Sequence, residues 1–480
     1  MNTPRLLISA AHKSSGKTTI TMGLCAALAK RGQRVQAFKK GPDYIDPMWL
    51  ATASGRACYN LDPYLSTMDA LSASFAKYAA TADIAIVEGN KGLYDGLDLD
   101  GSNSNAAVAH ALGLPVVLVI DARGMTRGIA PLLLGYQAFD RELNIAGVIL
   151  NNLGGARHEA KLRAVIEHYT DLTVVGAVQC AATLAIDERH LGLLPSTEQD
   201  DARQKAAVIG DIISDHVDVD KLLLIAATAR PMVPVVPTAS LSTPPQRGKP
   251  LRIGVARDKA FGFYYAEDLA ALEAAGAKLI FIDTLTQQRL PQLDGLIIGG
   301  GFPEVFMDQL EANSTLRREI GAAIRAGLPT FAECGGLMYL ANSLTWKGQT
   351  RAMVGVIPGD AVMHARPVGR GYVTLAATGN FPWALRAGTP VRGHEFHYSS
   401  LDNLPADTRY GWSVTRGHGI DGKNDGIVMH NLTASYAHLR GVDTWLAPFM
   451  DMVRSRANRP GPAILPPRRR PLTTNHLAYV

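Results

Sequence analysis

A predicted buried strand that leads directly into a phosphate-binding loop restricts the N-terminal part of this chain to few folds. The apolar segment Arg5–Ala11 predicts a strand, and a helix is expected from about Thr18 to Arg31. In such a loop, backbone N–H groups bind phosphate, a lysine adds positive charge, and a hydroxyl binds Mg²⁺. Lys17 and Thr18 supply the lysine and the hydroxyl, although Ala11 stands where the usual pattern has glycine. The predicted nucleotide contacts are Ser14, Ser15, Gly16, Lys17, Thr18 and Thr19.

Continuous apolar segments alternate with helix-like stretches through the first half of the chain. Further short strands are predicted at Arg34–Phe38, Asp83–Val87, Pro115–Asp121 and Ile145–Leu150. Strands without polar alternation indicate a parallel sheet that helices cover on both faces. The predicted fold class is therefore α/β, with an N-terminal P-loop doubly wound parallel sheet.

A proline-rich segment separates this region from a second α/β unit. A chain of 480 residues exceeds the size at which one core keeps growing, so two domains are expected. The second unit has predicted strands at Leu251–Ala256, Lys278–Asp283, Gly295–Ile298 and Thr330–Ala332. The expected division is a first domain at 1–227, a linker at 228–250, a second domain at 251–457, and a disordered Pro/Arg-rich tail at 458–480.

Composition excludes several classes of protein. The formal net charge is +5, but four arginines of the predicted tail account for most of it, which argues against a nucleic-acid partner. No apolar segment reaches the roughly 18 residues that span a bilayer, and the N-terminus lacks a signal-like pattern. The four cysteines lie far apart, so neither a disulfide framework nor a zinc site is indicated. A cytoplasmic protein without a membrane partner is expected.

Acidic residues near the ends of predicted strands are candidates for binding Mg²⁺, which prefers oxygen ligands. Glu88 ends a predicted buried strand directly before a glycine, at the sheet edge where open α/β sheets bind ligands. Asp43 and Asp46 are further candidates, although Asp46 can equally be a turn residue. Lys39 and Lys40 lie beside these acids, which favours contacts with phosphate or with substrate carboxylates.

Cys334 is the candidate nucleophile of the second domain. It lies between the predicted strand Thr330–Ala332 and the glycines Gly335 and Gly336, so a sharp turn presents it at the start of a helix. A cysteine placed in this way can attack the side-chain amide of glutamine and release ammonia. The backbone N–H groups of Gly301 and Gly335 are the expected oxyanion hole. Spacing alone leaves five histidines open as the base, which are His364, His394, His397, His430 and His438.

Four segments of the first domain resemble the cobyrinate a,c-diamide synthase family. They are Lys40–Asp46 (KGPDYID), Asn60–Asp62 (NLD), Val87–Gly96 (VEGNKGLYDG) and Glu188–Leu193 (ERHLGL). The resemblance implies a dethiobiotin-synthetase-like ATPase, here an amide ligase, fused to a class I (triad-type) glutamine amidotransferase. It also implies ATP and Mg²⁺ as cofactors, L-glutamine as ammonia donor, and a small-molecule tetrapyrrole as substrate. Whether the chain forms a homodimer is left open.

The same resemblance assigns roles to individual residues. Lys17, Thr18, Asp43 and Glu88 would hold Mg-ATP, with Thr18, Asp43 and Glu88 as the metal ligands. Asn151, which ends a predicted strand, would contact adenine, although a structural role fits it equally well. His438 is chosen as the base, because Asn431–Leu439 resembles a late segment of the family. The residues expected toward the substrate are Lys40, Tyr44, Ile45, Asp95, Arg189 and His190.

One position departs from the usual triad pattern. Many triad amidotransferases have a glutamate two residues after the histidine, and this chain has Arg440 there. The sequence therefore does not identify the acid that would orient His438, if one exists.

Together the two sites predict ATP-driven amidation of a carboxylate. ATP would phosphorylate the carboxylate, and ammonia from glutamine would displace the phosphate. The resemblance supplies cobyrinate and its a and c acetate side chains as substrate, with sirohydrochlorin, its nickel form or siroheme as the alternative. A non-enzymatic ATP switch of the partition type shares the first fold but has no use for Cys334. A stand-alone glutaminase would have no use for the phosphate loop.

Overall fold

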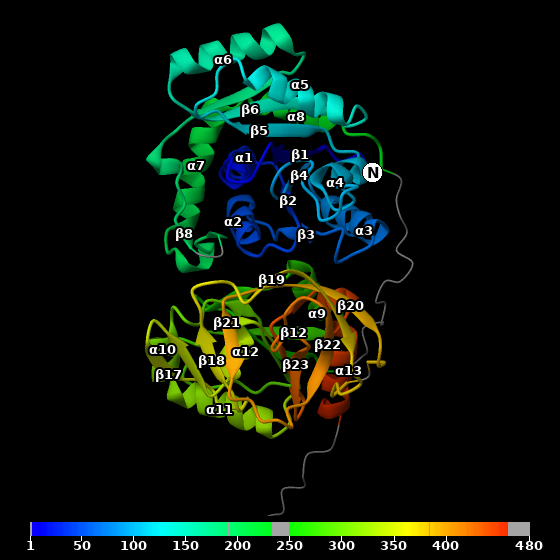
Figure 1. The fold of residues 1–480 in the computed structure, drawn as a ribbon, viewed down its shortest axis with the longest axis vertical. Coiled ribbons are helices and arrows are strands. Elements are labelled where there is room, and N and C mark those ends of the chain that lie inside the picture. Colours follow the sequence, from blue (N-terminus) through cyan, green and yellow to red (C-terminus); the bar gives the residue numbers. More distant parts are fainter. Residues whose placement is uncertain (1, 190–191, 233–248, 384, 459–480) are drawn as a thin grey trace, which may run out of the picture.

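The computed structural model describes residues 2–189, 192–232, 249–383 and 385–458. Most of the predicted linker (233–248) and of the predicted tail (459–480) lies outside these ranges, as does His190. The described residues form two α/β units that lie one above the other in Figure 1. Every strand that the sequence predicts overlaps a strand of the structure, and the predicted α/β class is confirmed.

The first unit is built on a seven-stranded parallel sheet in the order β3-β2-β4-β1-β5-β6-β7. After β1 the chain forms β2, β3 and β4 on one side of this central strand and then crosses to form β5, β6 and β7 on the other side. The strand order therefore reverses at β1, and open α/β sheets bind ligands at the carboxyl end of such a switch point. The strands are β1 (Arg5–Ala10), β2 (Val35–Lys40), β3 (Tyr59–Leu61), β4 (Ile84–Glu88), β5 (Val116–Asp121), β6 (Ile145–Leu153) and β7 (Val174–Gln179).

Helices cover both faces of this sheet, so its strands are buried on both sides. In β1, Leu6 and Ile8 pack toward α1, α2, α7 and α8, whereas Leu7 packs toward α3, α4, α5 and α6. Side-chain caps begin α3 and α4, where Thr67 and Ser104 accept backbone N–H groups. The helices are α1 (Lys17–Lys30), α2 (Ile45–Ser54), α3 (Met68–Ala79), α4 (Asn105–Leu112), α5 (Ile129–Phe139), α6 (Ala156–Tyr169), α7 (Ala202–His216) and α8 (Val219–Ala227).

The second unit contains a ten-stranded mixed sheet in the order β12-β10-β13-β15-β24-β23-β22-β19-β20-β25. Its first five strands are parallel and the remaining pairs are antiparallel. The strands are β10 (Leu251–Ala256), β12 (Ala277–Ile282), β13 (Gly295–Ile298), β15 (Thr330–Glu333), β19 (Gly369–Ala377), β20 (Pro390–His397), β22 (Tyr410–Arg416), β23 (Asn424–Met429), β24 (Leu432–Ser435) and β25 (His438–Leu439). The helices are α9 (Ala266–Ala274), α10 (Met307–Ala312), α11 (Ser314–Arg325), α12 (Gly335–Leu340) and α13 (Leu446–Ala457).

Smaller sheets complete the two units. A four-stranded sheet has the order β17-β16-β18-β21, and two strand pairs are β11–β14 and β8–β9. Their bounds are β8 (Glu188–Arg189), β9 (Gly192–Leu193), β11 (Phe261–Phe263), β14 (Gly300–Gly301), β16 (Ser343–Trp346), β17 (Gln349–Ala352), β18 (Asp360–Met363) and β21 (Ser399–Asp402). Within the described ranges, no helix combines the length and apolar character that crossing a membrane requires.

The two units contact each other through polar and aromatic side chains. The Tyr64 and Tyr372 rings stack with centroids 4.3 Å apart, and the Tyr372 hydroxyl donates to Asp62 Oδ2 at 3.0 Å. Ser74 of α3 donates to Glu267 of α9 at 3.0 Å. The strand β19 lies on the face of the second unit toward the first unit, and β3 is the strand of the first sheet labelled nearest to it (Figure 1). The hydroxyls of Tyr64, which follows β3, and Thr374 of β19 form a hydrogen bond.

Candidate functional site

The phosphate-binding loop connects β1 to α1, and a glycine determines its path. Gly16 has φ 86°, a left-handed conformation that favours glycine. The side-chain amide Nδ2 of Asn151 donates to the Ser15 carbonyl at 2.9 Å, and a Cβ added at Gly16 would lie 2.2 Å from that nitrogen. Asn151, near the end of β6, therefore supports the loop, and the adenine contact expected of it stays a prediction.

Lys17, the first residue of α1, is buried but weakly paired. Its Nζ lies 3.4 Å from the carbonyl oxygen of His12. Burial lowers the pKa of Lys17 to about 8, and the nearby charge of Lys39 adds to the effect. An anion next to Nζ would remove this penalty, which is the role that a phosphate would fill. Ser15 is buried and donates to the His12 carbonyl at 2.9 Å, whereas Ser14 is exposed and Thr19 is half-buried.

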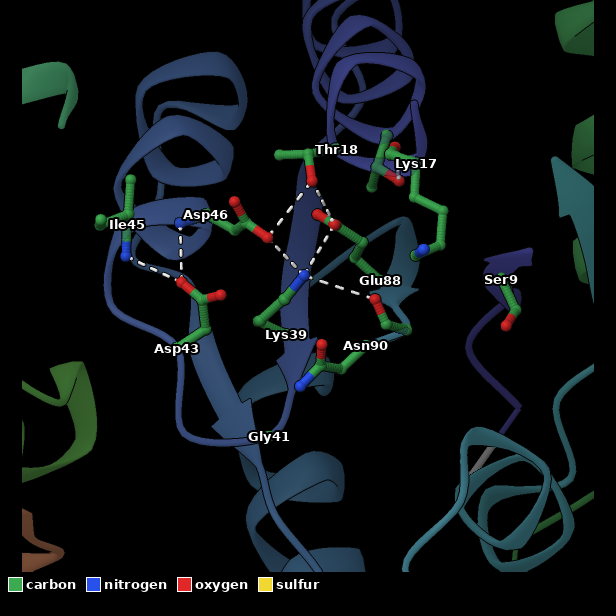
Figure 2. Close-up of polar contacts among 12 residues, drawn as sticks. Ser9, Lys17, Thr18, Lys39, Gly41, Asp43, Ile45, Asp46, Glu88 and Asn90 are labelled. Atoms are coloured by element: carbon green, nitrogen blue, oxygen red, sulfur yellow. Dashed lines mark hydrogen bonds and ion pairs between the residues drawn. The ribbon is translucent and has the colours of Figure 1, made fainter. Parts of the chain in front are cut away.

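Asp46 and Glu88 converge on the ammonium group of Lys39, and the Thr18 hydroxyl contacts both carboxylates (Figure 2). Lys39 Nζ lies 2.5 Å from Asp46 Oδ2 and 2.8 Å from Glu88 Oε1. The Thr18 hydroxyl donates to Glu88 Oε1 at 2.7 Å and lies 3.2 Å from Asp46 Oδ2. Burial would lower the pKa of Lys39, but Asp46, Glu88 and Asp43 outweigh it and raise that pKa. These oxygens, which come from α1, α2 and β4, already surround a cation.

Asp43 lies beside this cluster and makes other contacts. Its Oδ1 accepts the backbone N–H groups of Ile45 and Asp46 at 2.9 and 3.0 Å, at the start of α2 (Figure 2). Burial raises the pKa of Asp43 to about 6 and that of Glu88 to about 7. Of the two aspartates, the structure thus places Asp46 next to Thr18 and Glu88, while Asp43 shapes the loop.

Cys334 lies on a sharp turn between β15 and α12. Its φ and ψ are 47° and −101°, a conformation that few non-glycine residues adopt and that is typical of functional sites. The two predicted oxyanion residues lie together, because a Cβ added at Gly335 would be 3.0 Å from the backbone nitrogen of Gly301. The turn therefore brings the thiol and two glycine N–H groups to one place.

The structure brings His438 of β25 to this cysteine. His438 is buried, and its ring stacks on that of His394 at a centroid distance of 5.0 Å. Burial would lower the pKa of His438, but hydrogen bonds with Cys334 and Glu333 outweigh it and raise that pKa to about 10. Of the other candidates, His397 stacks on Tyr436, and His364 and His430 are exposed.

Glu333 is the site residue that sequence reasoning did not assign. Its Oε2 lies 3.3 Å from Nδ1 of His438, and its Oε1 accepts the backbone N–H of Leu439 at 2.9 Å. The available signal was its place directly before Cys334, at the end of a buried strand. Arg440, where a triad glutamate was sought, contacts Glu267 and the Ser66 hydroxyl instead.

A cavity of about 300 Å³ lies between the two units. Tyr44 projects into it from the loop before α2, and its ring lies 5.2 Å from that of His438 and 5.4 Å from that of Phe263. The lining includes Asp43, Tyr44, Ile45, Asn90 and Lys91 from the first unit, and His394 and His438 from the second. One cavity therefore contacts both the magnesium-site loop and the histidine of the cysteine site.

Comparison with known proteins places both units in known families. Residues 4–186 match the AAA domain, and residues 252–441 match the CobB/CobQ-like glutamine amidotransferase domain. The cobyrinate a,c-diamide synthase of Magnetococcus marinus is 46% identical over 451 residues, which cover 93% of this chain and 96% of that protein. The same-named protein of Methanosarcina acetivorans is 42% identical over 465 residues, covering 92% and 93%. The chain belongs to the cobyrinate a,c-diamide synthase family.

As a family member, the chain is a glutamine-dependent amidoligase that uses ATP and Mg²⁺. The cluster of Thr18, Asp46 and Glu88 fits a magnesium ion, because Glu88 Oε2 is buried and has no hydrogen-bond partner among the described residues. The Thr18 hydroxyl and Asp46 supply further oxygens beside it. Bound Mg²⁺ would neutralise phosphate charge there.

The residues expected toward the substrate divide into two groups. Lys40 is buried, donates to Asn103 Oδ1 at 3.2 Å, and has its pKa lowered to about 8 by burial. Asp95 accepts the backbone N–H of Gly92 at 2.8 Å, and Tyr44 and Ile45 line the cavity. Arg189 instead pairs with Glu198 at 2.7 Å and lies over the Phe302 ring, near the cysteine site.

We expect substitution of Asp46 and of Asp43 to affect metal binding to different degrees. Asp46→Asn is expected to raise the Mg²⁺ or Mn²⁺ concentration needed for half-saturation about 10- to 100-fold, because a charged oxygen beside Thr18 and Glu88 is lost. Asp43→Asn is expected to change it less, because its carboxylate binds backbone N–H groups. Mn²⁺ binding in the presence of ATP, followed by electron paramagnetic resonance, measures both. A larger effect at Asp43 would assign the metal to the residue that the sequence comparison indicated.

Proposed function

We propose that this protein converts the a and c acetate carboxylates of cobyrinate to amides, with ATP as the energy source and glutamine as the nitrogen source. The observation that carries this proposal is the 46% identity to a cobyrinate a,c-diamide synthase over 93% of the chain, across both units. In this scheme, residues 1–227 form the ligase domain and residues 251–457 form the glutaminase domain.

The ligase domain would activate the carboxylate. A carboxylate oxygen attacks the γ-phosphorus of ATP, ADP leaves, and an acyl phosphate forms on the substrate. Lys17 and the loop N–H groups would bind the phosphates, and Thr18, Glu88 and Asp46 would hold Mg²⁺, with Asp43 supporting the loop. Lys40, at the end of strand β2, would bind another of the substrate's carboxylates.

The glutaminase domain would supply ammonia. His438 takes the proton of the Cys334 thiol, the thiolate sulfur attacks the side-chain amide carbon of glutamine, and His438 then gives that proton to the leaving nitrogen, so that NH₃ departs. Water then cleaves the thioester, which releases glutamate and restores the thiol. The N–H groups of Gly301 and Gly335 would stabilise the oxyanion of both tetrahedral intermediates.

The cavity between the units supports transfer of ammonia from one site to the other. It is lined by His438 of the second unit and by Asp43 and Asn90 of the first. His394, which also lines it, has its pKa lowered by burial and stays uncharged. Ammonia that reaches the ligase site unprotonated is nucleophilic and would displace phosphate from the acyl phosphate.

Mass spectrometry of the reaction tests the substrate. Purified protein is incubated with Mg-ATP, glutamine and either cobyrinate or sirohydrochlorin. Each conversion of a carboxylate to an amide lowers the substrate mass by about one dalton. Two conversions on cobyrinate, and none on sirohydrochlorin, are the expected result.

Other outcomes would contradict this proposal in distinct ways. Conversion of sirohydrochlorin alone would move the substrate to the siro-type tetrapyrroles with the same chemistry. Hydrolysis of glutamine without conversion of either compound would show that the substrate is another carboxylic acid.

A further inference from the structure

The carboxylate of Glu333 lies beside the Nδ1 nitrogen of the His438 imidazole. Nδ1 lies 3.3 Å from Glu333 Oε2, and only 4% of the His438 side chain and 9% of the Glu333 side chain are exposed. A base that shuttles a proton through one ring nitrogen needs its other nitrogen fixed, because that contact selects the tautomer and the ring orientation. Glu333 meets this requirement and leaves Nε2 for Cys334.

Glu333 is itself held in place by two independent constraints. It is the last residue of β15, so its backbone belongs to the parallel part of the large sheet. Its second oxygen accepts the Leu439 N–H at 2.9 Å, which ties the carboxylate to the strand that carries His438. The carboxylate therefore aligns both the ring and the backbone of β25.

Other charged groups around His438 are committed elsewhere. Arg440 contacts Glu267 and Ser66 and carries the wrong charge to stabilise an imidazolium. Asp268 accepts the backbone N–H groups of Gly441 and Val442, at 2.8 and 2.9 Å. Asp425 in the same way accepts those of Tyr436 and Ala437. These two acids shape the chain on either side of β25.

The remaining titratable groups that face the ring come from other elements. They are Cys334 on the turn after β15, His394 on β20 and Tyr44 on the loop before α2. Burial lowers the pKa of His394 and raises that of Tyr44, so both stay neutral near pH 7. Glu333 is the carboxylate that can balance the charge of a protonated His438.

We propose that Glu333 is the positioning acid of the glutaminase site and replaces the glutamate that related triads carry two residues after the histidine. This rests on the proposed function of Cys334 and His438 in glutamine hydrolysis. The nucleophile and the acid are then adjacent residues on one turn. Because the acid is at position 333, position 440 is free to hold an arginine. Arg440, which directly follows β25, contacts Ser66 and so joins this part of the chain to the ligase domain.

The test compares Glu333→Gln with wild type by glutamate release, measured without any tetrapyrrole. Glutamine is nearly isosteric and can still accept the Leu439 N–H, but it lacks the charge. We expect kcat for glutamine hydrolysis to fall about 10²- to 10⁴-fold while KM changes little. The imidazolium is less stable without the carboxylate, so the His438 pKa falls from about 10, and the alkaline limb of the rate profile moves to lower pH.

Two further variants and a second nitrogen source make the result decisive. Glu333→Asp keeps the charge and is expected to restore part of kcat and of the alkaline limb. Glu319→Gln is the matched control, because that carboxylate likewise accepts a backbone N–H, from Leu290 at 2.7 Å, and pairs with a side chain, Arg289. Amidation supported by ammonium salts should be unchanged in all three variants.

Either of two results would overturn the assignment. Glutamine hydrolysis by Glu333→Gln within twofold of wild type would mean that His438 needs no acid. An equal loss of ammonium-supported amidation in the Gln and Asp variants would assign Glu333 to folding or domain contact. If cobyrinate is not converted, the comparison of glutamate release between the variants still holds, because that release is measured without any tetrapyrrole.

Discussion

Replacing Cys334 with alanine is expected to abolish glutamine-dependent amidation, by about 10³-fold or more, while ammonium salts still support the reaction. The alanine variant has no nucleophile to form the thioester, so no ammonia is released. The ligase site lies in the other domain and receives ammonia from solution. Amide formation with each nitrogen source, followed by mass spectrometry, measures the two rates separately.

Cys180 provides the matched control, because it is exposed and lies in the ligase domain. Cys180→Ala should retain both rates. Glutamine-dependent amidation that persists in Cys334→Ala would mean that another group releases the ammonia, and the glutaminase assignment would fail.

The loop before α2 gives a physical basis for coupling the two reactions. Asp46, in the first turn of α2, contacts Lys39 and Thr18 of the nucleotide site, and Tyr44, two residues earlier in the loop, packs against His438. Both contacts belong to one short segment, so a shift of Asp46 on binding Mg-ATP would also move the ring beside the histidine. Such a movement would make glutamine hydrolysis depend on the state of the ligase site.

Local sequence patterns were sufficient to predict the elements that carry both sites. An apolar segment predicts the strand Arg5–Ala10, and the Gly-Lys-Thr sequence soon after it predicts the phosphate-binding loop. The helix-forming segment that comes next predicts α1. The turn at Cys334 likewise lies between a buried strand and two glycines. Such features depend on interactions within about ten residues, which is the range over which sequence pattern is informative.

Contacts between distant segments could not be predicted in the same way. Asp43 and Asp46 are three residues apart, and only the start of α2 determines which of them faces Glu88. The pairing of Glu333 with His438 joins residues 105 positions apart in a sheet whose antiparallel half has no strong local signal. The usual triad spacing leads to position 440 for the acid, but the sequence has an arginine there. In the fold, Arg440 contacts Ser66 of the other domain.

Replacing Lys17 with methionine is expected to lower amidation about 10²- to 10³-fold with either nitrogen source, because the charge that faces the ATP phosphates is lost. Glutamate release should persist, since the cysteine site is untouched. Stability should not fall, because burial penalises the charged form of Lys17 and lowers its pKa to about 8. Amidation rates, glutamate release and the thermal unfolding midpoint measure these three effects.

The lowered pKa also gives the sign of a pH effect on stability. Between about pH 8, the pKa of Lys17 in the folded protein, and 10.5, the ordinary pKa of a lysine, the unfolded chain binds more protons at this residue, so its contribution to the free energy of unfolding rises with pH. Lys17→Met should remove that rise, whereas Lys30→Met, which changes an exposed lysine of α1 paired with Asp211, should keep it. Wild-type amidation rates in Lys17→Met would place the ATP phosphates elsewhere, and a marked loss of stability would mean that Lys17 supports the fold rather than the nucleotide.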